Sequence, residues 1–238
     1  MSLERKLRRA RDSICGLLRI RRVPPNQVTL TIVGTAWCFV RNQYFLTAHH
    51  VLNDGQPRQP DDQFLILRAP ENGTKLERMP VTGFAHEDPQ HDVAILKISD
   101  PSAQGITVPA LTISFDRVPD GTSVLTYGYP APQVTSASLT EGQLNFQTVL
   151  VATANRGIVS AQFPPKEAPV YVFNIHWFNG ESGGPILREQ TLAAFAVMQG
   201  YVNVQAPHGI IAGPRMGRSL AAIHDRIVPL LPRGRRVW

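Results

Sequence analysis

The sequence predicts an all-β fold. Turn-forming residues are abundant, with 18 glycines and 20 prolines, while aromatic residues make up only 8% of the 238 residues. Short β-like runs separated by turn residues recur along the chain, without alternation of strands and helices. Because 43% of the residues are hydrophobic, the chain can bury a sizeable core. Together these observations favour a β-barrel or a β-sandwich.

The β-like runs fall into two groups. A connection rich in Pro, Asp and Gly, residues 115–122, separates them and predicts one unit over residues 25–115 and another over residues 116–216. The predicted strands are residues 27–34, 44–48, 63–69, 92–98, 123–129, 148–154, 170–178 and 191–200. Residues 217–238 form a C-terminal helix and basic tail in this interpretation, because residues 219–231 have helical apolar spacing.

The N-terminal segment, residues 1–24, is predicted to be a basic amphipathic helical extension. Its apolar residues recur at alternating spacings of four and three, with arginines on the other faces, and Pro24 and Pro25 end the pattern. The apolar stripe consists of Leu3, Leu7, Ala10, Ile14 and Leu17.

The net charge of +6 belongs to this extension. Residues 1–22 contain eight Lys or Arg and two acidic residues, and the rest of the chain is balanced. A basic helix can bind a regulatory protein, nucleic acid or a membrane surface. The alternative is a helix that packs on its own domain and exposes its basic face to solvent.

Other sequence features argue against several classes of protein. No apolar segment is long enough to cross a bilayer, and the charged N-terminus does not resemble a signal peptide. Cys15 and Cys38 have neither metal-ligand nor disulfide-framework spacing. We therefore expect a cytoplasmic protein without a transmembrane segment, and we expect no metal and no organic cofactor.

Ser182 lies in a glycine-rich stretch, FNGESGGPIL, residues 178–187. Such a stretch is either a turn or the site of a nucleophile. A serine hydroxyl reacts at neutral pH only when a base accepts its proton and a third group orients that base.

His50 and Asp92 are the candidates for base and orienting acid. His50 follows the strand-like run FLTA, and Asp92 precedes the apolar run VAILKI. The chain order His, Asp, Ser differs from the order Ser, acid, His of α/β-hydrolases and from subtilisin, in which the aspartate comes first. The order therefore points to a different fold.

Three segments, LTAHH, HDVAIL and GESGGP, resemble the signature segments of chymotrypsin-like (trypsin-like) serine proteases. The segments GTAWCFV, GYP and GIVSA resemble the bacterial Deg-type branch and its single-domain relatives without a PDZ module. The resemblance covers residues 27–215. It implies two six-stranded antiparallel β-barrels, over residues 25–115 and 116–216, with the active site between them.

The resemblance also implies a role for each residue. His50 would act as general base and then as general acid, Asp92 would orient it, and Ser182 would form an acyl-enzyme. The backbone N–H groups of Gly180 and Ser182 would form the oxyanion hole.

A substrate pocket is implied by position. His176 would lie at its floor, and Met198, Gln199 and Gly200 would form its wall. No aspartate occupies the floor, so a preference for Lys or Arg is not supported; a medium-sized apolar or polar side chain fits better.

Glu181 departs from the pattern, since secreted members carry Asp and Deg-type members often carry Asn at this position. One interpretation is an exposed side chain. The other is a carboxylate that a partner or a local arginine holds, which would control formation of the oxyanion hole.

The leading functional hypothesis is a serine endopeptidase with a restricted protein substrate, regulated as an effector in bacterial defence or signalling. The alternative is a latent or inactive trypsin-like binding module that acts through its basic N-terminal helix. Retention of all three triad residues favours the first.

Overall fold

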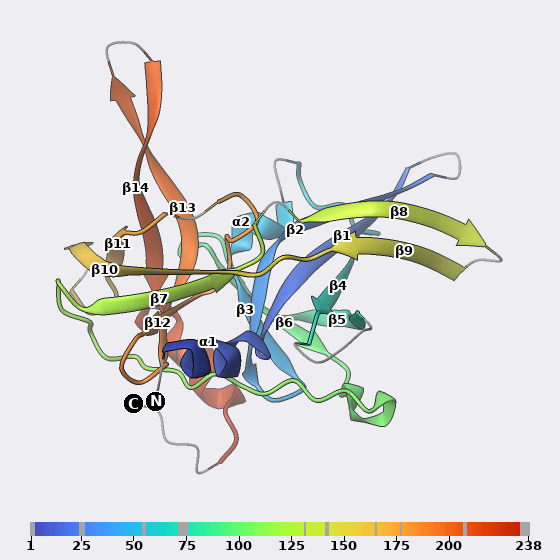
Figure 1. Ribbon diagram of the computed structural model, residues 1–238, viewed down its shortest axis with the longest axis horizontal. Coiled ribbons are helices and arrows are strands. Elements are labelled where there is room, and N and C mark those ends of the chain that lie inside the picture. The colour runs from blue at the N-terminus through green and yellow to red at the C-terminus, as the bar shows by residue number, and fades with distance from the viewer. Residues whose placement is uncertain are drawn as a thin grey trace.

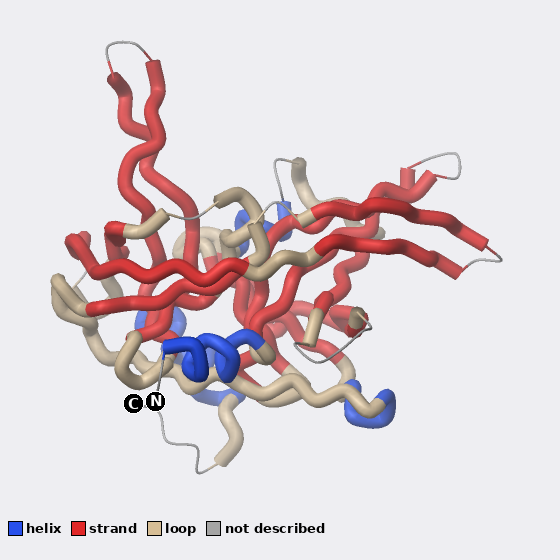
Figure 2. The backbone as a smooth tube through the Cα atoms, in the orientation of Figure 1, coloured by secondary structure: helices blue, strands red, loops and turns tan. Residues whose placement is uncertain are grey.

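The computed structural model contains two closed β-barrels, a separate two-stranded ribbon and short helices (Figures 1 and 2). It describes residues 3–23, 27–53, 56–70, 76–130, 132–140, 143–164, 166–176, 178–206 and 209–233. Each barrel has six strands paired antiparallel, so the predicted all-β double barrel is confirmed.

The first barrel has the strand order β1-β2-β3-β6-β5-β4 and closes where β1 pairs with β4. Its interior is filled by large apolar side chains, including Trp37, Phe39 and Phe45, which are fully buried. Its strands are β1 (Ile14–Val23), β2 (Gln27–Val40), β3 (Tyr44–Thr47), β4 (Gln63–Arg68), β5 (Glu77–Asp88) and β6 (Val93–Ile98).

The second barrel has the order β10-β11-β14-β13-β12-β7. Tyr171, Phe173 and Phe195 form its aromatic core, with the Tyr171 and Phe195 rings edge-to-face at 5.1 Å between centroids. Its strands are β7 (Ser123–Gly128), β10 (Thr153–Phe163), β11 (Val170–Asn174), β12 (Pro185–Arg188), β13 (Ala194–Ala206) and β14 (Gly209–Ser219).

The ribbon consists of β8 (Gln133–Thr140) and β9 (Gln143–Val149). Figure 1 shows it beside the β1–β2 hairpin, where Phe146 of β9 packs with Leu18 and Leu67 of the first barrel. The ribbon thus covers an outer face of that barrel. The β13–β14 hairpin extends away from the second barrel as another arm (Figure 1).

Helices are short. The N-terminal helix is α1 (Leu3–Arg11), and α2 (His49–Asn53) follows β3. The remaining helical segments are η1 (Pro101–Gln104), η2 (Leu220–Ile223), α3 (His224–Ile227) and η3 (Val228–Leu230). In the described part of the chain, no helix has the length and apolar character needed to span a membrane.

The prediction that residues 1–24 form a helical extension is wrong beyond Arg11, because residues Ile14–Val23 form β1. Leu17 packs in the main core, whereas its neighbour Leu18 packs under the ribbon. Both faces of the strand are therefore covered, which removes the alternation of polar and apolar residues by which a strand is recognised. The first barrel consequently begins within the predicted extension 1–24.

Candidate active site

His50 and Asp92 meet because β3 and β6 are neighbours. Thr47 pairs with Ala94, so the end of β3 lies beside the start of β6. The imidazole Nδ1 of His50 lies 2.8 Å from Asp92 Oδ2, and the backbone N–H of His50 donates to Asp92 Oδ1 at 2.7 Å. Because an ionised carboxylate only accepts hydrogen bonds, Nδ1 carries the proton and Nε2 is left to accept one.

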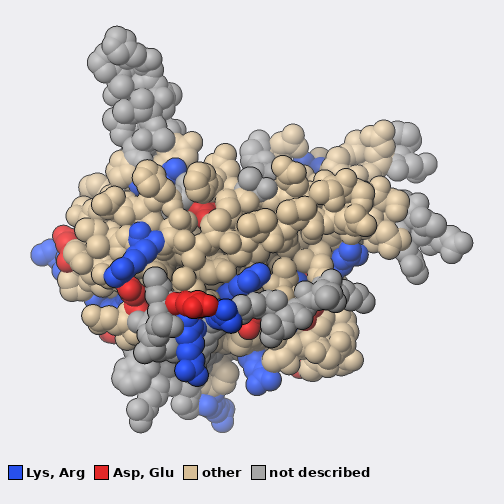
Figure 3. All heavy atoms as spheres, in the orientation of Figure 1, with Lys and Arg blue, Asp and Glu red and all other residues tan. Residues whose placement is uncertain are grey.

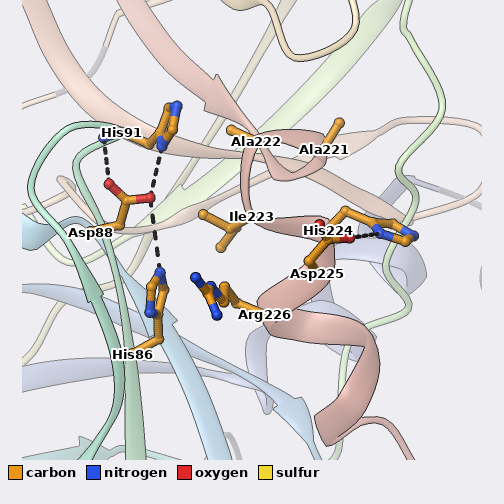
Figure 4. A pocket seen from close by; sticks show the side chains of 9 residues that line it. All are labelled: His86, Asp88, His91, Ala221, Ala222, Ile223, His224, Asp225 and Arg226. Carbon is orange, nitrogen blue, oxygen red and sulfur yellow. Dashed lines mark hydrogen bonds and ion pairs between the residues drawn. The ribbon is translucent and has the colours of Figure 1, made fainter.

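Asp92 has a left-handed backbone conformation, with φ of 55°. This conformation is uncommon for residues other than glycine, although aspartate tolerates it better than most. The adjacent residue, His91, holds the turn: its backbone N–H and its ring Nδ1 contact the Asp88 carboxylate at 2.9 and 2.7 Å (Figure 4). Burial alone would raise the Asp88 pKa, but the hydrogen bonds from His91 and the electrostatic interactions with His91 and His86 outweigh it and lower that pKa.

The loop that carries Ser182 is anchored to the first barrel by Thr35 of β2. The backbone N–H of Thr35 donates to the Ser182 carbonyl at 2.8 Å, and its hydroxyl donates to the Gly180 carbonyl at 2.8 Å. Gly180 and Gly183 have φ of 98° and 85°, which only glycine adopts without strain. The two barrels therefore hold this loop jointly.

The Ser182 hydroxyl donates to the backbone carbonyl of Gln199 at 3.1 Å. Within the described residues, no hydrogen bond joins Ser182 Oγ to the His50 ring. The Gln199 side chain donates to the His91 carbonyl at 2.9 Å. Gln199 thus contacts both the serine and the turn that carries Asp92.

Glu181 is fully buried, with 0% of its surface exposed, so the interpretation as an exposed residue is wrong. Its carboxylate accepts hydrogen bonds from the Thr153 hydroxyl, from Asn155 Nδ2 at 3.2 Å and from the Phe178 N–H at 2.6 Å. Burial raises its pKa, and these donors only partly offset that effect. The hydrogen-bond donors named here are uncharged groups, and the positive charge of Arg215 also lowers the Glu181 pKa.

The two predicted oxyanion donors, the N–H groups of Gly180 and Ser182, flank this buried glutamate in the chain. In the described ranges, neither N–H donates to a backbone carbonyl, whereas the neighbouring Gly183 N–H donates to the Met198 carbonyl at 2.8 Å. Among the described residues, both N–H groups are therefore without a backbone acceptor.

The predicted pocket residues lie on two segments. His176 follows β11 and is exposed, while Gln199 and Gly200 belong to β13 and are half-buried. Met198 is fully buried in the core of the second barrel. Its side chain is therefore not available for the pocket wall expected there.

Four residues that support the site were not identified from the sequence: Thr35, His91, Thr153 and Asn155. Each acts through a partner distant in the chain or through a backbone group, so local sequence carries no signal for Thr35, Thr153 or Asn155. His91 is the exception, since it precedes Asp92 directly in the segment HDVAIL.

Comparison with known proteins agrees with this architecture. The trypsin-like peptidase domain family matches residues 34–194. No curated protein matches the chain significantly.

Solved structures with a similar fold include HtrA-type proteases. AlgW with a decapeptide has a TM-score of 0.64 and 17% identity, over 95% of this chain and 68% of that one. AlgW with a tripeptide has a TM-score of 0.61 and 18% identity, over 96% of this chain and 64% of that one. Deg5 has a TM-score of 0.61 and 14% identity, over 92% of this chain and 89% of that one. The chain thus spans about two thirds of the length of the AlgW chains.

Proposed function

Because this chain belongs to the trypsin-like peptidase family, we propose that it is a serine endopeptidase in which Ser182, His50 and Asp92 form the catalytic triad. The observation that carries the proposal is the contact between His50 and both carboxylate oxygens of Asp92. It leaves the Nε2 atom of His50 to act as the base that serine chemistry needs.

In the proposed reaction, the Ser182 hydroxyl first leaves the Gln199 carbonyl and turns to His50 Nε2. Its oxygen then attacks the scissile carbonyl carbon while His50 takes the proton. The N–H groups of Gly180 and Ser182 stabilise the resulting oxyanion; one such donor is typically worth about 2.7–4 kcal/mol in the transition state. His50 returns the proton to the leaving amine, and water hydrolyses the acyl-enzyme through the same steps.

Glu181 has a positioning role in this proposal. It lies between the two oxyanion donors, and its carboxyl joins the Phe178 N–H to the Thr153 hydroxyl on β10. The loop therefore keeps its conformation only while this buried carboxyl is held. A change in β10 that withdraws Thr153 or Asn155 would release the loop and lower activity without altering the triad.

The proposed substrate is an extended segment of protein with restricted sequence. The presence of a tripeptide or a decapeptide in AlgW structures supports a peptide ligand for this fold. His176, Gln199 and Gly200 are the proposed pocket residues, together with the backbone of Met198, and they suit a medium-sized apolar or polar side chain. An effector role in bacterial defence or signalling remains part of the proposal by analogy alone.

Labelling with a fluorescent fluorophosphonate tests the proposal. We expect covalent labelling of the full chain that is lost in Ser182→Ala and His50→Ala. Arg156→Gln, which removes an exposed arginine paired with Glu189, serves as the folded control. Labelling that persists in Ser182→Ala would exclude Ser182 as the nucleophile.

The second candidate is a latent module that binds through α1. The hydrogen bond between Ser182 and Gln199 favours latency, because the hydroxyl donates to a backbone carbonyl and not to the proposed base. The surface around α1 argues against a purely cationic docking face: Arg8 pairs with Glu4 at 2.7 Å, and basic and acidic side chains are interleaved on the face shown in Figure 3. Absence of labelling in the wild type, with labelling after deletion of residues 1–13, would support this candidate.

A further inference from the structure

A cavity of about 400 Å³ lies behind the turn that carries Asp92. One wall is formed by His86, Asp88 and His91, at the end of β5 and in the following turn. The opposite wall is the helical segment of residues 221–226 (Figure 4). The volume is in the range of cavities that bind small molecules.

The polar end of the cavity holds one carboxylate that already accepts hydrogen bonds and one buried nitrogen that has no partner among the described residues. The Asp88 carboxylate is already bonded to the ring and the backbone N–H of His91. His86 Nε2 is buried without a hydrogen-bond partner among the described residues, and it lies 3.9 Å from Asp88 Oδ2. An unsatisfied buried nitrogen of this kind is costly unless a ligand or a water completes it.

Arg226 adds a cationic group at the same end. Figure 4 shows its guanidinium pointing toward His86, and it forms no ion pair with any of the described residues. Asp225 does not neutralise it there: its side chain is 95% exposed and bonded to His224, on the side away from the Asp88 cluster (Figure 4). A guanidinium matches the geometry of a carboxylate well.

The other residues that line the cavity indicate the chemistry of the rest of the ligand. Ala221, Ala222 and Ile223 add apolar side chains to the lining. A divalent cation is a poor fit, since the described residues contain no group of three side chains that could ligate a metal, and since Arg226 would repel it.

We propose that this cavity binds a ligand that carries a carboxylate, with the carboxylate between Arg226 and His86 and an apolar part on Ala221, Ala222 and Ile223. Free small acids and the C-terminus of a peptide share this chemistry.

The cavity is coupled to the active site through His91. The same residue lines the cavity, precedes Asp92 in the chain and accepts the side-chain hydrogen bond of Gln199. A carboxylate that joins Arg226 to His86 links the C-terminal helical segment to β5, and this link restricts the turn that carries Asp92. We therefore expect ligand binding to accelerate fluorophosphonate labelling of Ser182 by about fivefold or more, the usual size of coupling between two sites. This expectation rests on the proposed function, whereas binding of the ligand does not.

Binding is tested on the full Ser182→Ala chain by ligand-observed NMR and calorimetry. The probes are linear monocarboxylates from acetate to octanoate, and a tripeptide ending in leucine, as free acid and as amide. We expect saturable binding of at least one acid, weakened about tenfold or more by Arg226→Gln and by His86→Phe. Arg156→Gln, which removes an exposed arginine paired with Glu189 on the second barrel, is the matched control and leaves binding unchanged.

The outcomes separate the sources of the carboxylate. Binding of the linear acids indicates a free small acid, and binding of the tripeptide acid but not of its amide indicates a peptide C-terminus. Equal binding of acid and amide, binding that survives Arg226→Gln, or no binding of any probe to the folded chain overturns the proposal. Fluorophosphonate labelling of the wild type is measured separately. If the chain binds the acid but is not labelled, the proposed function is refuted and the proposed carboxylate site is still supported.

Discussion

The hydroxyl of Ser182 donates to the carbonyl of Gln199, and the side chain of Gln199 reaches across to the carbonyl of His91. In the proposed mechanism, this connects the nucleophile to the turn that carries the orienting acid, Asp92, in the opposite barrel. Ser182 would then have to break one hydrogen bond before it reacts, and the strand that holds the acceptor is itself bonded to the first barrel.

Gln199→Ala tests this connection. The substitution keeps the carbonyl that accepts from Ser182 but removes the anchor to His91, so the acceptor is less well positioned. One intramolecular hydrogen bond is worth about 1 kcal/mol, so we expect labelling by a small fluorophosphonate to accelerate by at most about fivefold. The second-order rate constant of labelling measures this change in rate, with Arg156→Gln as the surface control. A large decrease in the rate would show instead that the anchor supports the reactive conformation.

Asp92→Asn tests the orienting role. The amide can place its NH₂ group against His50, which selects the wrong tautomer and leaves no base for Ser182. We expect turnover to fall by a factor on the order of 10⁴, the size found when the equivalent carboxylate is replaced in other triads. The thermal midpoint of unfolding, measured in parallel, checks that the variant is folded. Activity within tenfold of the wild type would remove Asp92 from the mechanism.

Glu181→Gln tests the buried carboxyl through stability. Because burial raises the pKa of Glu181, the folded state keeps the proton to a higher pH than the unfolded chain does. The stability that this proton provides is complete below the unfolded pKa, about 4.3, and is lost as the pH rises through the folded pKa. We therefore expect the stability of Glu181→Gln, relative to the wild type, to increase as the pH rises from the unfolded pKa of Glu181 to its folded pKa.

Denaturant unfolding of both proteins over a series of pH values measures this difference. If the wild type instead gains stability over Glu181→Gln as the pH rises, the carboxylate is the favoured form in the folded protein. The positioning role of Glu181 would then rest on its charge and not on hydrogen bonding alone.

Gly183→Ala tests the close contact of the serine loop with the first barrel. A Cβ atom at Gly183 would collide with the Thr47 hydroxyl and the Thr35 carbonyl, and would lie 2.9 Å from the Ala48 backbone nitrogen. Overpacking costs about 1–3 kcal/mol, in addition to about 1–2 kcal/mol for the left-handed conformation.

Gly105→Ala is its matched control, because Gly105 has a similar φ of 74° and no atom within 4 Å of an added Cβ. Gly105→Ala has only the cost of the left-handed conformation. The difference in unfolding free energy between the two variants therefore gives the cost of the steric clash at Gly183. Equal losses would mean that the loop moves away from the first barrel at little cost.

Prediction of strands from the sequence succeeded where turn residues bound a short apolar run on both sides. Residues 44–48, 63–69 and 92–98 are predicted strands that correspond to β3, β4 and β6. β5, β8, β12 and β14 were not predicted. The predicted strand 148–154 is wrong as a single element, because β9 ends at Val149 and β10 begins at Thr153.

The sequence by itself determined the chemical inventory of the site. Ser182, His50 and Asp92 stand in short local motifs at strand ends and turns, whose residue types reflect local backbone requirements. It also determined the fold class, since turn composition and the absence of strand–helix alternation depend on local sequence alone.

Only the tertiary structure decided how those groups are held. The burial of Glu181 by Thr153 and Asn155, the anchoring of the serine loop by Thr35 and the contact between Ser182 and Gln199 all join residues far apart in the chain. Such contacts depend on the closure of both barrels and on their packing against each other, and no local pattern encodes them. Tertiary contacts also explain why β1 was not predicted. The barrel core covers one face of β1 and the ribbon covers the other, so its sequence does not alternate between polar and apolar residues.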